Sequence, residues 1–167
     1  MSAQVLPAKC HVLLERRKVR KKTKPHKDLP NNWKTYVDLK VTDRESYLEI
    51  DIYFTKKFKG CGKRIGHLSI DKTEPEHFVS SIQIGDKYRG FGLGKMLYLE
   101  ALDVMKNITT SSESSAFARR AWSSIMKERP FIMDWVTGDV TFFKNRYWMR
   151  KYLANNLDKN KRKVHFE

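Results

Sequence analysis

Apolar and polar residues alternate most regularly between Tyr47 and Phe54. Every second position there is apolar: Leu48, Ile50, Ile52 and Phe54. A period of two residues is typical of a strand that buries one face. The apolar runs 64–70 and 78–84 predict two further strands, because turns containing glycine or proline at 56–63 and 71–77 separate the three runs. The pattern therefore predicts a meander of three strands.

A helical period replaces the alternation from Leu93 onwards. Apolar residues recur there three or four positions apart and form one stripe: Leu93, Leu97, Ala101 and Val104, widened by Met96 and Met105. Lys106-Asn107 ends this helix, and the β-branched segment 108–110 predicts a short strand. A second helix ends before Pro130 and carries apolar residues at helical spacing: Ala118, Ala121, Trp122 and Ile125.

The remaining segments continue the alternation of strands and helices. Residues 131–136 and 140–143 flank a Thr-Gly-Asp turn and predict a closing hairpin or one strand with a bend. Residues 147–157 predict a helix before a polar, basic tail at 158–163. Residues 12–14 predict an edge strand, whereas 33–41 is apolar without a clear period. We expect an α/β fold of the α+β kind in a single domain, 1–167. A basic arm (1–30) and a basic helix and tail (146–167) would flank its centre.

The turn between strand 78–84 and the first predicted helix carries the clearest chemical signal. It reads Tyr88-Arg89-Gly90-Phe91-Gly92-Leu93-Gly94. Amide groups at a helix start have no intrahelical partner and lie at the positive end of the helix dipole, so they bind anions. The glycines allow a tight turn and close approach of a ligand to the backbone. The turn therefore predicts a phosphate site.

Glycine spacing distinguishes between the known phosphate-binding patterns. A P-loop requires Gly-Lys-Ser/Thr, whereas Met96 follows Gly94-Lys95 here. A dinucleotide fingerprint requires G-x-G-x-x-G, which the glycines at 90, 92 and 94 do not match. The pattern R/Q-x-x-G-x-G/A fits Arg89 to Gly94 without a mismatch. This segment resembles the acetyl-CoA pyrophosphate loop of the GNAT acetyltransferase superfamily.

The resemblance to GNAT proteins covers roughly residues 46–128. It implies a central mixed, mostly antiparallel sheet with helices on both faces, and acetyl-CoA as the cosubstrate. Residues 82–84 match the apolar-x-apolar strand end that pairs with pantetheine in that family. Ser115, Ala118 and Trp122 stand where the family has Asn-x-x-Ala-x-x-x-Tyr, a partial match that resembles phage-borne members. The implied cofactor-binding residues are Ile82, Gln83, Ile84, Arg89, Gly90, Phe91, Gly92, Leu93, Gly94, Lys95, Ser115 and Trp122.

The resemblance implies an N-acetyltransferase that moves an acetyl group from CoA to an amine. Such an amine has a pKa near ~10 and must lose a proton before it attacks. The sequence leaves the base open among carboxylates and imidazoles that also fit as ordinary surface groups: Glu49, Asp51, Asp71, Glu74, Glu76, His67 and His77.

The catalytic candidates are Glu49 and His67, with Ser115 as a hydrogen-bond donor or simply a helix cap. Trp122 replaces the tyrosine that serves as the acid in the family. An indole N–H donates a hydrogen bond but delivers no proton at neutral pH. Catalysis therefore lacks a recognisable acid.

Charge points to anionic partners. The chain of 167 residues has 34 Lys+Arg and 19 Asp+Glu, a formal net charge of +15. This balance favours polyanions, and the phosphates of CoA account for part of it. The basic segments 16–27 and 159–163 are candidate surfaces for nucleic acid or an acidic protein, although basic residues on an edge strand also prevent edge-to-edge pairing. The expected acceptor is an amine on an anionic macromolecule or a protein.

The two cysteines, Cys10 and Cys61, are too few for a disulfide framework or a cysteine-rich metal site, so no metal is expected. No apolar run approaches the ~20 residues that span a bilayer, and the N-terminus lacks the pattern of a secretory signal. We expect a cytoplasmic monomer or homodimer without a membrane partner, in the host cytoplasm if a phage encodes it.

A second function remains open. A non-catalytic protein with the GNAT fold could bind nucleic acid or a host protein through its basic surface. It predicts salt-sensitive binding of the partner that survives substitutions in the glycine turn.

Overall fold

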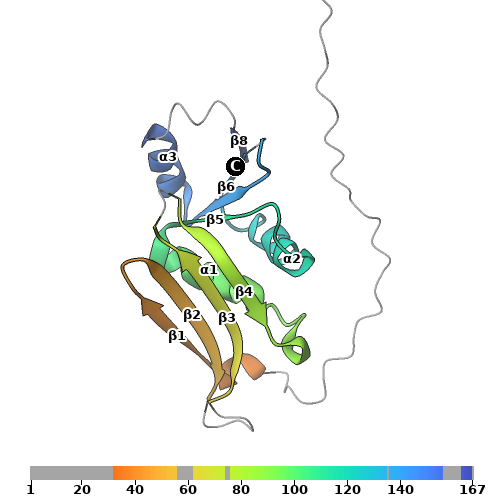
Figure 1. Ribbon diagram of the computed structural model, residues 1–167. Helices are drawn as coiled ribbons and strands as arrows, with labels where there is room; N and C mark the ends of the chain where they lie inside the picture. The colour runs from red at the N-terminus through yellow and green to blue at the C-terminus, as the bar shows by residue number, and fades with distance from the viewer. Residues whose placement is uncertain (1–31, 56–61, 74–75, 135, 156–162, 167) are drawn as a thin grey trace, which may run out of the picture. The chain divides into compact units, whose positions relative to one another are not determined.

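A computed structural model describes residues 32–55, 62–73, 76–134, 136–155 and 163–166 (Figure 1). The chain divides into two units, 1–31 and 32–167, and all the described residues belong to the second unit. The predicted strand at 12–14 and the basic segment 16–27 lie outside the described residues, as do residues 159–162 of the second basic segment.

One mixed sheet organises the described part of the second unit (Figure 1). It has eight strands in the order β1-β2-β3-β4-β5-β7-β6-β8. Their bounds are β1 (Val37–Asp43), β2 (Tyr47–Phe54), β3 (Arg64–Asp71), β4 (Phe78–Ile84), β5 (Asn107–Thr110), β6 (Phe131–Asp134), β7 (Val140–Phe143) and β8 (Lys163–Phe166). The helices are α1 (Leu93–Met105), α2 (Ala116–Ile125) and α3 (Arg146–Asn155), with short 3-10 turns η1 (Trp33–Tyr36) and η2 (Asp86–Tyr88).

All neighbouring strands pair antiparallel except β4 and β5, which are parallel. The expectation of an α/β fold with a mixed, mostly antiparallel sheet is confirmed. The three predicted meander strands, the helix from Leu93 and the hairpin around Thr137–Asp139 are confirmed as well.

Two segments differ from expectation. Residues 33–41, which showed no clear period, contain the 3-10 turn η1 and most of β1. Lys163, placed by sequence in a polar tail, instead begins β8. Pairing with Asp134 of β6 supplies backbone partners to this terminal segment, and a local pattern of side chains carries no sign of that distant strand.

Helix α1 covers one face of the meander and is seen behind the strands in Figure 1. A Cβ placed on Gly94 of α1 would lie 3.8 Å from Cδ1 of Ile82 in β4. Ile82 pairs with Leu68, and Leu68 pairs with Ile50, so these side chains point to the same face. Leu68 and Ile50 are fully buried. The alternate residues of the strands therefore point to the opposite face.

Helix α3 packs against that opposite face at the other end of the sheet. Met149 of α3 forms a buried cluster with Ile132 of β6 and Phe143 of β7. The register links this cluster to the face opposite Leu68 through successive pairs: Ile132–Thr141, Thr141–Thr109, Thr109–Phe78 and Phe78–Asp71. The sheet thus has helices on both faces, as expected.

Strands β4 and β5 share a single bridging pair, Phe78 with Thr109. Ser80 forms a bulge in β4, because Ser69 and Ile70 of β3 pair with Ser81 and Val79. A bulge bends its strand and increases the local twist. Beyond the bridge, the edge of β4 that faces away from β3 has no strand partner among the described residues. No residue of this central strand is fully buried, in contrast to β2 and β3.

Candidate functional site

The glycine turn after β4 is an open loop of left-handed glycines. Gly90 has φ 90° and Gly92 has φ 85°, a conformation that side chains with a Cβ rarely adopt. A Cβ on either glycine would meet nothing within 4 Å. The glycines therefore meet a backbone requirement and leave the space above the loop clear for a ligand.

Backbone donors face this space at the start of α1. Gly92 is the N-cap, and no side chain caps the helix. The first intrahelical bond runs from the Met96 amide to the Gly92 carbonyl at 3.0 Å. The amides of Leu93, Gly94 and Lys95 precede that bond and have no carbonyl within the helix to receive them. With the helix dipole, these donors form what we call the glycine cradle, residues 89–95.

The free edge of β4 adjoins the cradle. The Gly85 amide donates to the Ile65 carbonyl at 3.0 Å, which fixes the phase of the antiparallel ladder. Alternation then directs the backbone of Gln83 towards β3 and the backbones of Ile82 and Ile84 away from it. The Ile84 carbonyl on this edge already accepts from Arg89 Nε at 3.1 Å. The amides of Ile82 and Ile84 point to the same edge and are the donors that it offers to a ligand.

Arg89 stabilises the cradle through three contacts of its side chain. Besides its bond to Ile84, its Nη1 lies 2.8 Å from Asp86 Oδ1, and its Cζ lies 4.3 Å from the ring centroid of Phe117 in α2. These contacts tie the turn to the end of β4 and to the second helix. Lys95 is engaged as well, since its Nζ forms an ion pair with Glu128. The backbone amides are therefore the cradle donors that no carboxylate of the protein already engages.

The two positions that differ from the family pattern have clear local roles. Ser115 caps α2, because its Oγ accepts from the Ala118 amide at 3.3 Å. Trp122 is buried, and its indole N–H donates to the hydroxyl of Tyr98 in α1 at 3.1 Å. Burial raises the pKa of Tyr98 to about 12, and the Trp122 donor opposes part of that rise. Trp122 thus connects α2 to α1 by a hydrogen bond in the buried core near the cradle.

Among the base candidates, the structure pairs His67 with Asp51. His67 Nδ1 lies 2.7 Å from Asp51 Oδ1, and Arg64 Nη1 lies 3.3 Å from the same oxygen. His67 sits opposite Gln83 in the ladder, on the face away from α1. This imidazole is therefore one strand away from the free edge of β4. When Nδ1 of an imidazole donates to a carboxylate, Nε2 carries the lone pair that can accept a proton from another group.

The other base candidates lie apart from this pair. His77 Nδ1 contacts the Asn107 carbonyl at 3.3 Å, and Glu74 is outside the described residues. Hydrogen bonds from the hydroxyl and the amide of Thr73 lower the pKa of Asp71. Glu49 and Asp71 line a shallow hollow of about 380 Å³ over β2 and β3, with Ser46, Tyr47, Ser69, Thr73 and Ser80.

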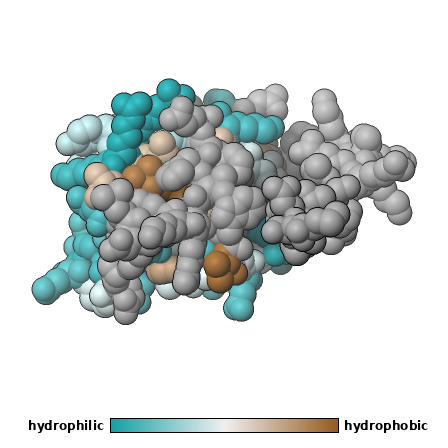
Figure 2. All heavy atoms as spheres, turned by 90° about the horizontal axis from the view of Figure 1, so that it is seen from above, coloured by the Kyte–Doolittle hydropathy of each residue, from teal (hydrophilic) through white to brown (hydrophobic). Residues whose placement is uncertain are grey.

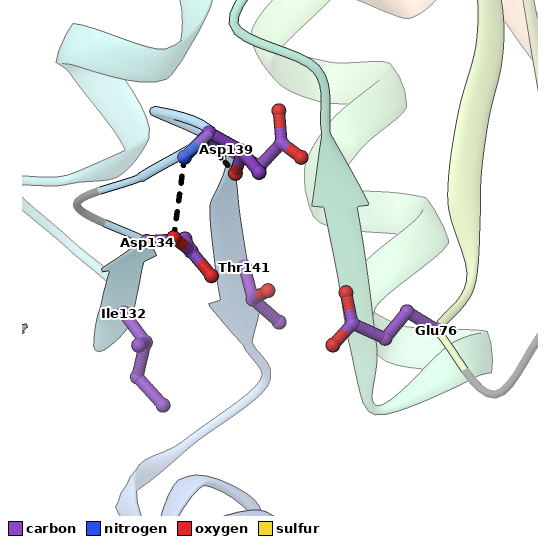
Figure 3. Close-up of a pocket in the computed structure, with 6 residues that line it drawn as sticks. Glu76, Ile132, Asp134, Asp139 and Thr141 are labelled. Carbon is purple, nitrogen blue, oxygen red and sulfur yellow. Dashed lines mark hydrogen bonds between the residues drawn. The ribbon is translucent and has the colours of Figure 1, made fainter. Parts of the chain in front are cut away.

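A second hollow, of about 140 Å³, lies among β6, β7 and the segment before β4 (Figure 3). We call it the acidic pocket, because three carboxylates line it together with Ile132, Thr137 and Thr141: Glu76, Asp134 and Asp139. The Tyr152 hydroxyl donates to Glu76 Oε1 at 2.6 Å. Burial and the neighbouring Glu76 carboxylate raise the pKa of Tyr152. The sequence indicated only Glu76 as a candidate, since Asp134 ends β6 and Asp139 directly precedes β7, far from Glu76 in the sequence.

In the view of Figure 2, the described side chains at the margin are mainly hydrophilic, with small groups of hydrophobic ones between them. Within the described ranges, no helix has the length and hydropathy to cross a membrane. The same residues contain no group of three or more His, Cys, Asp or Glu side chains placed to hold a metal ion.

No model of a known protein family matches the sequence, and no curated protein matches it significantly.

Proposed function

We propose that this protein is a GNAT-like N-acetyltransferase that binds acetyl-CoA at the glycine cradle. One observation carries the proposal: unsatisfied amides of residues 93–95 adjoin a strand edge that, among the described residues, has no neighbour beyond the β4–β5 bridge. The motif of residues 89–94 and the single parallel pair in the described sheet support the same assignment.

The pyrophosphate of CoA would accept hydrogen bonds from the amides of the cradle. The pantetheine arm, which carries two amide groups, would continue along the free edge of β4 as an added strand does. The amides of Ile82 and Ile84 would then be the donors to pantetheine and to the thioester oxygen. Donors fixed in place before reaction stabilise the negative charge that develops on that oxygen.

Proton transfer would rely on groups other than Trp122. The Asp51–His67 pair lies one strand from the β4 edge at which the thioester would be held, so it is the base candidate that geometry favours. Thiolate is a fair leaving group, so the reaction does not depend on a strong acid. The acceptor we propose is an amine on an anionic macromolecule or a protein, in keeping with the net charge of +15.

The test has two stages. Calorimetry with CoA measures binding to the full chain, and a thiol reagent then measures CoA release from acetyl-CoA with lysine-rich protein, aminoacyl-tRNA or polyamine as acceptor. Binding with turnover on one acceptor class supports the proposal. Binding without turnover on any class contradicts the enzymatic part, and no binding contradicts the whole.

A second candidate function is favoured by the core position of Trp122. Its bond to Tyr98 places a packing contact where GNAT enzymes have a proton donor. A non-catalytic protein of this fold would retain CoA without consuming acetyl-CoA. It would also bind a polyanion such as RNA with an affinity that falls steeply with salt and is unchanged by Gly92→Glu.

A further inference from the structure

Phe117 stands exposed between two arginines at the start of α2. Its side chain is 52% exposed, an unusual position for a phenylalanine in a helix that buries three other residues. The ring centroid lies 4.3 Å from Arg89 Cζ and 5.4 Å from Arg120 Cζ. Both guanidinium groups are within the range of cation–π attraction, so the ring holds them on the same small area of surface.

The two arginines differ in what else they contact. Arg89 pairs with Asp86 and donates to the Ile84 carbonyl. No carboxylate pairs with Arg120 among the residues that the structure describes. A guanidinium that is held by an aromatic ring, but not neutralised, keeps its hydrogen-bond donors for an anion.

This patch borders the glycine cradle. A Cβ on Gly94 would lie 3.7 Å from Cβ of Ala121, the residue after Arg120, so the first turn of α1 touches α2 at this point. Arg89 belongs to the cradle itself. An anion bound at the amides of residues 93–95 would therefore have Arg120 beside it.

We propose that Arg120, positioned by Phe117, binds the 3′-phosphate of the CoA nucleotide. This inference rests on the proposed function, in which the pyrophosphate of CoA occupies the cradle. The ribose of that nucleotide carries a third phosphate a short distance from the pyrophosphate. The subsite would distinguish CoA from nucleotides that carry the pyrophosphate alone.

Comparison of CoA with 3′-dephospho-CoA tests the subsite by calorimetry on the full chain at low salt. We expect the wild-type protein to bind CoA about tenfold more tightly, as one charge-assisted contact at a partly exposed site provides. Arg120→Ala should reduce this ratio to about one and leave the affinity for 3′-dephospho-CoA within about twofold. Phe117→Leu, which removes the ring but preserves an apolar side chain, should lower the ratio less.

Arg119→Ala is the matched control. Arg119 is the adjacent exposed residue of α2, carries the same charge, and directs its Nη1 to the Ser112 carbonyl at 3.5 Å. If Arg119→Ala and Arg120→Ala lower the ratio equally, the effect is general electrostatics and the subsite is wrong. Equal binding of the two ligands by the wild-type protein also overturns the subsite while CoA binding stands. If neither ligand binds, the proposed function fails together with the subsite.

Discussion

The glycine cradle and the acidic pocket are two surface regions of one unit with opposite hydrogen-bonding groups. The cradle offers backbone amides from consecutive residues, and its donors lack partners within the helix. The pocket offers carboxylates from segments more than fifty residues apart in sequence, and these already accept hydrogen bonds: Glu76 from Tyr152, Asp134 from the Val136 amide and Asp139 from the Ser112 amide. The first region has donors left for a ligand, whereas the carboxylates of the second already connect separate segments of the fold.

This difference separates the effects of substitution. A change in the cradle should alter binding of CoA more than the free energy of unfolding. A change at the pocket should alter the free energy of unfolding and leave CoA binding intact, because its hydrogen bonds connect protein groups to one another.

The largest expected effect comes from Gly92→Glu. A carboxylate there repels phosphate, and its side chain fills the space above the amides, so CoA affinity should fall more than about 100-fold. Calorimetry with CoA measures the loss. Gly62→Glu is the matched control, because Gly62 also has a left-handed φ, of 75°, and an open Cβ position, but lies in the turn before β3.

Both glycine variants should lose a similar free energy of unfolding, roughly 1–2 kcal/mol, from the left-handed backbone. If Gly62→Glu weakens CoA binding as much as Gly92→Glu, the cradle is not the CoA site.

The second prediction concerns one tyrosine near each region, the buried Tyr98 of α1 and the partly buried Tyr152 of α3. Burial raises the pKa of Tyr98 to about 12, although the Trp122 indole donates to its oxygen. Burial and Glu76 raise the pKa of Tyr152. An unfolded tyrosine has a pKa near ~10, so above that pH the unfolded chain releases protons that the folded chain retains. Stability is therefore full below pH ~10 and falls between pH ~10 and ~12, by at most ~1.4 kcal/mol per pH unit for each tyrosine.

Denaturant unfolding at pH ~8 to ~11.5 measures this slope across the range in which the unfolded tyrosines titrate. Tyr98→Phe should make the fall shallower, and the exposed Tyr147 of α3 provides a control, since Tyr147→Phe should leave the slope unchanged. A slope that is the same in wild-type protein and Tyr98→Phe would contradict a raised pKa of Tyr98.

The same contrast explains what the sequence could predict. The alternation at 47–54 identified β2, because one buried face imposes a period of two on consecutive residues. The cradle could be recognised because its glycines and donors are local. The acidic pocket could not, since Glu76 meets Asp134 and Asp139 only through the order of strands in the sheet.

Three further features also depend on contacts that a local pattern does not show. Strand β8 is established by its pairing with β6, because its four residues alone are too short a segment to show a clear period of two. The hydrogen bond between Trp122 and Tyr98 joins residues 24 positions apart on two helices. Helical spacing predicted that Trp122 faces the core, but not which hydroxyl would receive its N–H. The motif at 89–94 indicated Arg89 as a cradle residue, yet its role as a brace depends on Asp86, Ile84 and Phe117 together.

At the pocket, Tyr152→Phe removes the hydroxyl that donates to Glu76. The free energy of unfolding should fall by about 1 kcal/mol, the usual contribution of one such bond, while the dissociation constant for CoA stays within about twofold. Chemical denaturation and calorimetry measure the two quantities on the same preparation. If CoA affinity falls in proportion to stability, the two regions are coupled and the contrast between them does not hold.

The smallest effect tests whether side chains supplement the backbone in the cradle. Lys95 follows the glycines, and its ammonium group pairs with Glu128, both groups being partly exposed. Glu128→Gln removes the competing carboxylate charge, so Lys95 becomes available to a phosphate, and CoA binding should tighten about two- to threefold at low salt. The free energy of unfolding should change by less than ~1 kcal/mol, as is usual for exposed ion pairs. Because screening weakens this contribution, the gain should disappear at high salt. If Glu128→Gln instead weakens CoA binding, the ion pair supports the cradle rather than competing with the ligand, and the donors of residues 93–95 depend on the contact between α1 and the segment after α2.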